Sequence, residues 1–337
     1  MTHTIDYFEM MEPMKYYDNP EPKTDGARKK RQDIIDNAAN RYIGSEKHDG
    51  DWGLFIHIKQ GQNLIRSRSI SKVTGKYGDL TAKLPHLAEE MDTWPDETVV
   101  IAEICWDTYG TNANTVGTIL RCLPEKAVER QKSQKLVGKV FDILMLRGED
   151  LTAENYEKRL KVADKFLQEI EGRYFTLTQV FEGNFAEEAD KIISAGGEGL
   201  VLQLRSNPYM PGTRTAWATL KLKQALPHMD LKVIGVLEPN RIYEGDCPET
   251  WKYHDENGTP VTKPYYMKWK NGIIVDFNGV EVSVASGLED ADREWLATPQ
   301  ALEMIKNGEL YAEVKAMSVN DLGSLRHPAL VRLRNDM

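Results

Sequence analysis

Lys47 and Asp49 lie among glycines in the stretch SEKHDGDWG, residues 45–53. A lysine amine attacks an electrophile only when it is neutral, so a nucleophilic lysine needs nearby positive charge or desolvation. Asp-Gly is also a common hairpin turn signal, and a lysine beside such a turn is simply exposed. The stretch alone therefore leaves both interpretations of Lys47 open.

Carboxylates and cations also occur in segments that are otherwise apolar. Glu103 lies in IAEICW and Glu198 lies in GGEGLVLQ, where an unpaired carboxylate is expensive. Each is therefore expected to bind a cation or to form a buried salt bridge. Lys221 and Lys223 alternate in LKLK, so both lie on one side of a strand, where they could reach one polyphosphate or simply face solvent.

Short apolar runs bounded by polar turns predict the strands that position these residues. The runs lie at residues 53–58, 98–106, 138–146 and 199–204. Apolar residues at helical spacing predict helices within 152–172 and 184–197, the second of which ends in a double glycine. Because strands outnumber helices, we expect an α+β fold rather than a doubly wound one.

The pattern changes near KQALPHMD, residues 223–230, which predicts a boundary near residue 228 between domains at 1–228 and 229–337. Beyond the boundary, strand patterns occur at 231–238, 272–288 and 310–319, and a helix begins at Thr298-Pro299. This series of elements suits a small β-barrel such as an oligonucleotide-binding (OB) fold.

The composition argues against several classes of protein. The net charge of −9 argues against a protein that coats nucleic acid through bulk charge, although it allows a local basic track. Cys105, Cys122 and Cys247 have no spacing that indicates disulfides or a zinc site. Neither a signal peptide nor a membrane span is visible, so we expect a cytoplasmic protein with no membrane partner.

The order and spacing of the motifs resemble the nucleotidyltransferase motifs of ATP-dependent DNA ligases. The motifs are KHDG at 47, SRS at 67, IAEICW at 101, VFDIL at 140, GGEGLVLQ at 196, LKLK at 220 and the terminal SLRHPALVRLRND. The resemblance covers residues 41–337 and is closest to small two-domain viral and bacterial ligases, whereas residues 1–40 are unassigned. It implies an adenylation domain with antiparallel sheets, followed by an OB-fold domain that binds DNA.

The resemblance implies a role for each matching residue. Lys47 would be the nucleophile that becomes adenylylated, assisted in catalysis by Asp49, Lys221 and Lys223. The residues implied to hold ATP are Glu46, Lys47, Arg68, Glu103, Phe141, Glu198, Lys221, Lys223, Arg332 and Arg334. Those implied to bind the metal are Glu198, Glu103 and Asp49. Phe141 would stack on the adenine, and Arg68 would hold a phosphate of AMP or of the 5′ end at a nick.

The implied reaction seals a nick between a 5′-phosphate and a 3′-hydroxyl in duplex DNA through a lysine–AMP intermediate. ATP and Mg²⁺, with Mn²⁺ as a substitute, are the expected cofactors. The expected partners are ATP and nicked double-stranded DNA, and the protein is expected to be a monomer. It would act in DNA replication, repair or recombination in a bacterial or virus-infected cell. Arg326, Arg332, Arg334 and Asp336 would close over ATP.

Three positions depart from the family pattern, each through loss of positive charge. Trp52 stands where the family usually has arginine, and Gln203 and Met337 stand where it usually has lysine. These losses raise one alternative, a non-catalytic nick-binding module with a vestigial nucleotide pocket. The other alternative is an RNA ligase or an mRNA guanylyltransferase of the same superfamily.

Overall fold

The computed structural model describes residues 3–15, 24–37, 39–71, 74–108, 113–223, 228–243, 252–319 and 322–334. Cys247, Asp336 and Met337 lie outside the described residues. The chain divides into two compact units, Met1–Lys223 and Gln224–Met337, so the second unit begins a few residues before the predicted boundary.

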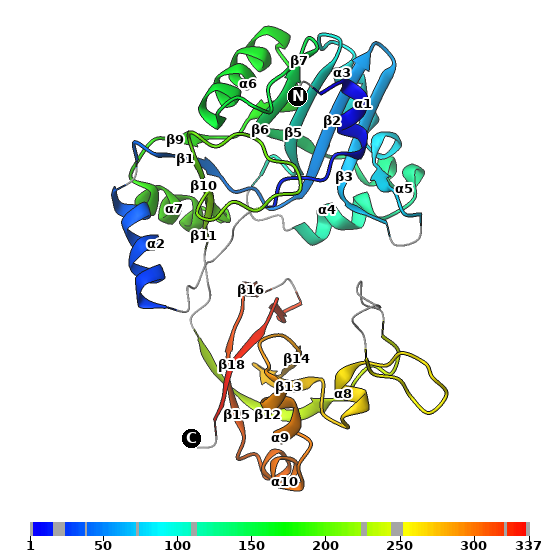
Figure 1. Cartoon of the computed structure of the whole chain (residues 1–337), viewed down its shortest axis with the longest axis vertical. Helices are drawn as coiled ribbons and strands as arrows, with labels where there is room; N and C mark the ends of the chain where they lie inside the picture. The colour runs from blue at the N-terminus through cyan, green and yellow to red at the C-terminus, as the bar shows by residue number, and fades with distance from the viewer. Residues whose placement is uncertain are drawn as a thin grey trace. The chain divides into compact units, whose positions relative to one another are not determined.

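The first unit contains a seven-stranded sheet in which every strand pair but one is antiparallel (Figure 1). Its strands are β2 (Asp51–Lys59), β3 (Gln62–Ile70), β4 (Tyr77–Asp79), β5 (Thr98–Cys105), β6 (Val137–Leu146), β7 (Glu149–Asp150) and β8 (Phe175–Leu177). The strand predictions at 53–58, 98–106 and 138–146 are confirmed as β2, β5 and β6. The parallel pair joins β6 and β8.

Helices cover one face of this sheet. They are α3 (Pro85–Met91), which follows the 3₁₀ helix η1 (Thr81–Lys83), α4 (Ala113–Leu120), α5 (Pro124–Arg130) and α6 (Tyr156–Ile170). Phe55 and Val100 belong to the core beneath these helices, because alternate residues of a strand point to the same face. The predicted helix within 152–172 is confirmed as α6, which starts after Asn155, whose side chain accepts a hydrogen bond from the Lys158 amide.

The N-terminal segment packs against the opposite face of the same sheet. Helix α1 (Ile5–Met10) buries Phe8, and Met11 continues the contact with Leu54 and Trp52 of β2. Arg66 of β3 donates from Nη2 to the Met11 carbonyl oxygen at 2.8 Å. Part of the segment that the sequence left unassigned is thus integral to the core of the first unit.

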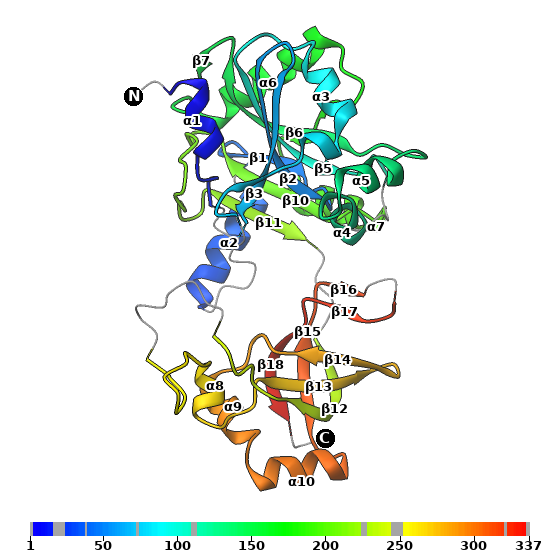
Figure 2. The ribbon, with the colours of Figure 1, turned by 90° about the vertical axis from the view of Figure 1, so that its right-hand side faces the viewer.

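A second sheet of four strands completes the first unit, in the order β11, β10, β1, β9 (Figure 2). Its strands are β1 (Tyr42–Glu46), β9 (Val180–Phe181), β10 (Gly199–Leu204) and β11 (Thr219–Lys223). Helices α2 (Asp25–Asn37) and α7 (Phe185–Ser194) cover one face with an apolar cluster that includes Ile34, Leu202 and Leu222. The predictions at 184–197 and 199–204 are confirmed as α7 and β10.

The second unit contains a five-stranded antiparallel sheet in the order β14, β13, β12, β15, β18. Its elements are β12 (Met229–Leu237), α8 (Lys263–Tyr266), β13 (Gly272–Phe277), β14 (Val280–Val284), α9 (Asp290–Trp295), α10 (Pro299–Asn307), β15 (Tyr311–Lys315), β16 (Ser318–Val319), β17 (Leu325–Arg326) and β18 (Ala329–Arg334). A bridge between Ser286 and Ala329 connects the two edges, so the sheet curls into a partly closed barrel of the OB type. The helix predicted at Thr298-Pro299 is confirmed as α10, which has Thr298 as its N-cap. Every helix in the described residues is too short or too polar to span a lipid bilayer.

A buried ion pair links the two sheets of the first unit. The Arg159 guanidinium of α6 donates to both carboxylate oxygens of Asp142 on β6, at 2.7 and 2.9 Å, and both side chains are almost fully buried. The same guanidinium donates at 3.2 Å to the carbonyl oxygen of Asn207, which follows β10. The pair therefore fixes the segment after β10 relative to β6.

Removing Arg159 should destabilise the first unit strongly. Arg159→Ala leaves the Asp142 carboxylate buried without its partner, which should lower the free energy of unfolding by about 3–5 kcal/mol in urea denaturation. Arg147→Ala is the matched control, because the Arg147–Glu169 pair is exposed and should contribute less than about 1 kcal/mol. Equal small effects of both substitutions would contradict a structural role for the buried pair.

Candidate active site

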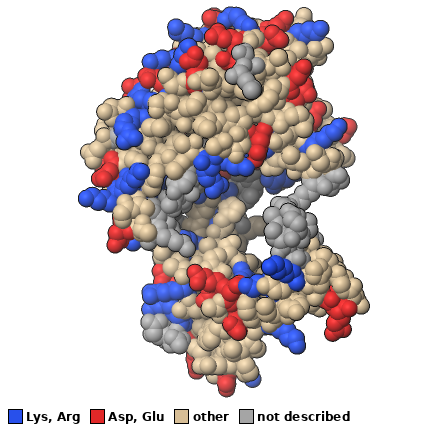
Figure 3. Space-filling model, in the orientation of Figure 1, with Lys and Arg blue, Asp and Glu red and all other residues tan. Residues whose placement is uncertain are grey.

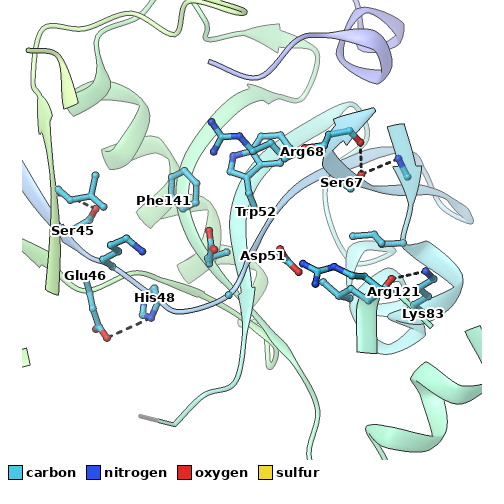
Figure 4. A pocket seen from close by; sticks show the side chains of 18 of the residues that line it. Ser45, Glu46, His48, Asp51, Trp52, Ser67, Arg68, Lys83, Arg121 and Phe141 are labelled. Carbon is cyan, nitrogen blue, oxygen red and sulfur yellow. Dashed lines mark hydrogen bonds and ion pairs between the residues drawn. The ribbon is translucent and has the colours of Figure 1, made fainter. Parts of the chain in front are cut away.

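A pocket of about 760 Å³ lies between the two sheets of the first unit. Its lining includes six of the residues singled out in the sequence: Glu46, Lys47, Arg68, Glu103, Phe141 and Lys221. They come from different strands of both sheets and are spread over much of the first unit in sequence. Figure 4 shows several of these side chains and their neighbours in the pocket.

Lys47 follows β1 directly, and both its main chain and its side chain form polar contacts. Its amide donates to the Gly199 carbonyl oxygen at 2.9 Å, and its Nζ contacts the Glu198 carboxylate. The side chains are only 20% exposed for Lys47 and 13% for Glu198. Interpreting Lys47 as an exposed turn lysine is therefore wrong, whereas its role as a nucleophile stays a prediction.

The chain that follows Lys47 packs directly on β5. A Cβ atom at Gly50 would lie 2.3 Å from the Ile104 carbonyl oxygen and 2.9 Å from Cβ of Cys105. Neither atom can move away at low energetic cost, because the first is main chain and the second belongs to a buried side chain. The glycine of KHDG is thus needed for close packing, which brings this loop next to Glu103.

Glu103 lies in a cluster of carboxylates around Lys47. Burial, helped by the charges of Asp51 and Glu198, raises the pKa of Glu103 to about 8 against the opposing effects of Lys47 and Arg68. The described residues contain no group of three His, Cys, Asp or Glu side chains that could hold a metal by themselves. Since Mg²⁺ usually takes one or two carboxylates plus water and substrate phosphates, the carboxylates present still suit this ion.

His48 fixes the end of β1 through a short chain of hydrogen bonds. The Thr178 hydroxyl donates to the Glu46 carbonyl oxygen at 3.2 Å, so it must accept from His48 Nε2, which lies 3.0 Å away. Burial, with the charges of Lys139 and Lys47, lowers the pKa of His48 to about 4. His48 is therefore neutral near pH 7 and adds no charge beside Lys47.

Two of the positions that depart from the family pattern lie in the pocket wall. Trp52 is 7% exposed and packs into the apolar cluster beneath the N-terminal segment, and Gln203 is 4% exposed. Phe141 packs partly against that cluster and also lines the pocket, so it is both a core residue and a residue of the pocket wall. The pocket therefore carries neutral side chains at two positions where the family usually has cations.

The remaining predicted residues lie elsewhere. Of the described residues, Asp49, Glu198 and Lys223 are neighbours of the pocket but do not line it, although Glu198 contacts the Nζ of Lys47, which does. Arg332 and Arg334 lie on β18 of the second unit, where Arg332 Nε contacts Glu313 at 2.6 Å and Arg334 Nη1 contacts Asp230 at 2.8 Å. Their proposed contact with ATP stays a prediction.

Sequence reasoning missed several side chains that line the pocket. The charged ones among them are Asp51, Asp79, Lys83 and Arg121, and Figure 4 labels Asp51, Lys83 and Arg121. Arg121 follows the apolar stretch of α4, and a glycine at position 117 inside that helical pattern was the available signal. Lys83 lies in η1 and has no distinguishing motif.

Comparisons with known proteins identify the family of this chain. A family model described as an ATP dependent DNA ligase domain matches residues 26–223. The DNA ligase of Nitrosopumilus maritimus is 26% identical over 224 residues, which cover 61% of this chain and 36% of that protein. The DNA ligase of Methanocorpusculum labreanum is 26% identical over 317 residues, which cover 89% of this chain and 52% of that protein.

The chain thus spans about a third to a half of the length of these curated relatives. A structure from a study of DNA binding by Lig E DNA ligases aligns with a TM-score of 0.62 at 16% identity. The alignment covers 96% of this chain and 98% of that one, so the two share a fold across both units.

The lowered pKa of His48 predicts a loss of stability in acid. The unfolded chain takes up this proton near pH 6.5 whereas the folded protein resists it down to about pH 4, so the free energy of unfolding should fall as the pH is lowered through that window. His48→Gln should remove this contribution, which is at most about 1.4 kcal/mol per pH unit. Urea denaturation between pH 4 and 7.5 measures it, with the exposed His254→Gln as control. Identical pH profiles for wild type and His48→Gln would contradict the assignment.

Proposed function

The chain belongs to the family of ATP-dependent DNA ligases, and from this membership we propose that it seals nicks between a 5′-phosphate and a 3′-hydroxyl in duplex DNA. The observation that carries the proposal is the contact of Lys47 with Glu198 in a pocket that Lys221 also lines. We expect one nucleotide to meet this amine, the carboxylate beside it and the second cation. The match of residues 26–223 to the ligase domain supports the same assignment.

In the first step, Lys47 Nζ attacks the α-phosphorus of ATP. A phosphorus–nitrogen bond forms, the bond to the β-phosphate oxygen breaks, and pyrophosphate leaves with its electron pair. The amine must lose a proton to attack, and Glu198 is the carboxylate in contact with it. Lys221 would neutralise charge on the polyphosphate, and Asp49 would orient the amine or the leaving pyrophosphate.

Phe141, Glu103 and Glu46 would hold the rest of the nucleotide. The ring of Phe141 would stack on the adenine, and Glu103 would accept a hydrogen bond from the ribose. Mg²⁺, or Mn²⁺ in its place, would supply charge neutralisation and alignment of the phosphates when held by Glu198, Glu103 or Asp49. A cation bound beside Glu103 would lower its raised pKa and favour its charged form.

The next two steps use DNA. An oxygen of the 5′-phosphate attacks the AMP phosphorus, the phosphorus–nitrogen bond breaks, and Lys47 regains its proton. The 3′-hydroxyl then attacks the 5′-phosphate, a phosphodiester bond forms, and AMP leaves. Arg68 would hold one of the phosphates. In the second unit, Arg332 and Arg334 would leave their partners Glu313 and Asp230 when they act on ATP.

Binding to DNA would depend on local cations of the protein. Lys and Arg are interspersed with Asp and Glu on the face shown in Figure 3, so that face is not uniformly basic. Contacts with the phosphate backbone would supply affinity with little sequence preference. A monomer is sufficient for this reaction, because one chain supplies all the groups invoked.

Adenylylation of Lys47 is the first prediction of this proposal. Wild-type protein incubated with ATP and Mg²⁺ should gain the mass of one AMP, and nicked duplex DNA should remove it. Lys47→Ala should gain nothing, and Lys59→Ala, which removes an exposed lysine at the end of β2, should behave as wild type. Intact-protein mass spectrometry measures all three.

If wild type gains no mass and is not already adenylylated as purified, the losses of positive charge at positions 52, 203 and 337 have disabled the first step. That result would favour the non-catalytic nick-binding module. Gain of GMP from GTP in preference to AMP would instead favour a guanylyltransferase, and sealing of RNA but not of nicked DNA would favour an RNA ligase.

Salt dependence is the second prediction. In EDTA, the affinity of wild-type protein for a nicked duplex should fall steeply between 50 and 200 mM salt, by roughly 0.9 log units per log unit of salt for each phosphate contacted. Fluorescence anisotropy with two unrelated nicked sequences should give the same slope. A flat response, or a strong preference for one sequence, would contradict binding through the backbone.

A further inference from the structure

We propose that Arg121 binds the terminal 5′-phosphate of the nicked strand in the pocket that contains Lys47. The inference rests on the proposed function and adds a residue that no motif of the sequence includes. Arg121 follows α4 directly and lines the pocket. Figure 4 shows Asp51 and Trp52 between Arg121 on one side and Ser45 and Glu46 on the other.

The Arg121 guanidinium is available for a ligand. It forms no hydrogen bond and no ion pair with any of the described residues, although its charge acts on Asp51 nearby. A guanidinium has five N–H donors in a planar fork that matches two oxygens of a phosphate. A cation in a pocket wall with its donors unused by the protein is suited to an anionic substrate.

The helix that precedes Arg121 has a glycine at the position where the guanidinium packs against it. A Cβ atom at Gly117, one turn earlier in α4, would lie 2.9 Å from Nη1 and 3.1 Å from Cζ of Arg121. Glycine inside a helix costs about 0.5–1 kcal/mol relative to alanine. The missing side chain leaves the space that the guanidinium occupies, so any side chain at position 117 would push the guanidinium aside.

Two side chains fix the end of α4 from which Arg121 projects. Lys83 Nζ donates to the Leu120 carbonyl oxygen at 2.6 Å, and Arg130 Nη1 donates to the Thr118 carbonyl oxygen at 2.5 Å. Both satisfy carbonyl groups at the C-terminal end of the helix, where cations are favourable. Arg121 is thus presented from a fixed turn rather than from a loose loop.

The position of Arg121 indicates which phosphate it binds. Lys47 and Lys221, which would handle the nucleotide, come from the end of β1 and from β11 of the four-stranded sheet. Arg121 follows a helix of the layer on the seven-stranded sheet, and its charge acts on Asp51, which precedes Trp52 on β2. A second cation across the pocket from the nucleotide would receive the second phosphate substrate, which is the 5′ end of the nick. The phosphates of ATP are the alternative source of the same chemical group.

The test compares two nicked duplexes that differ only in carrying a 5′-phosphate or a 5′-hydroxyl. Adenylylated protein is held in EDTA, and its affinity for each duplex is measured by fluorescence anisotropy. Wild type should prefer the 5′-phosphate, and Arg121→Gln should reduce that preference roughly 10-fold or more, as expected for loss of a charge-assisted hydrogen bond. The exposed Arg147→Gln should retain the preference of wild type.

Two further variants test whether Arg121 binds the phosphate or only supports the structure of the pocket. Gly117→Ala keeps the arginine and favours the helix, yet its Cβ displaces the guanidinium, so it should also reduce the preference for the 5′-phosphate. If Arg121 served only to neutralise Asp51, the double variant Asp51→Asn, Arg121→Gln would recover the preference. We expect no recovery.

Three results would overturn the inference. The first is an unchanged preference for the 5′-phosphate in Arg121→Gln, and the second is recovery in the double variant. The third is an unchanged preference together with an increase in the ATP concentration needed for self-adenylylation, which would assign the phosphate to ATP. If wild type itself bound neither duplex, or could not be adenylylated, the proposed function would fail first, and that failure is visible without any variant.

Discussion

The ion pair between Asp142 and Arg159 is the constraint on which the site most depends. Asp142 follows Phe141 on β6, and Arg159 belongs to α6 and also bonds the main chain after β10. One guanidinium therefore connects the seven-stranded sheet, its helical layer and the four-stranded sheet. The pocket lies between those two sheets, so its width depends on a contact made entirely in the protein interior. A buried pair suits this purpose because it is costly to break, even though it adds little net stability.

Charged side chains of both signs line the pocket. Glu103 and Asp51 have raised pKa values because burial and neighbouring carboxylates disfavour their charged forms, and His48 is neutral near pH 7. Lys47 is the cation in contact with Glu198 within this cluster. Strongly shifted pKa values in a pocket that also contains lysines and arginines are typical of functional sites. The losses at Trp52 and Gln203 make these cations more important.

The N-terminal segment has a clear structural purpose in the first unit. Phe8 and Met11 cover the face of β2 that carries Trp52 and Leu54, and the same apolar cluster extends to Phe141 in the pocket wall. Residues 3–15 thus support the side chains that would contact the base. The buried guanidinium of Arg66, which bonds the Met11 carbonyl oxygen and lies 3.7 Å from the ring centroid of Tyr77, anchors the segment.

The sequence by itself predicted several of the elements, a change of pattern near residue 228 and the side chains of the motifs. Strands such as β2 and β10 and helices such as α6 follow from local periodicity, which depends on near neighbours in the chain. Sequence could not place residues 3–15, could not decide whether Lys47 is exposed, and could not bring Arg121 to the pocket. Those facts depend on contacts between residues far apart in sequence, such as Lys47 with Glu198 and Arg159 with Asp142. Only tertiary structure decides such contacts, because burial and charge pairing are properties of the packed chain rather than of any short segment.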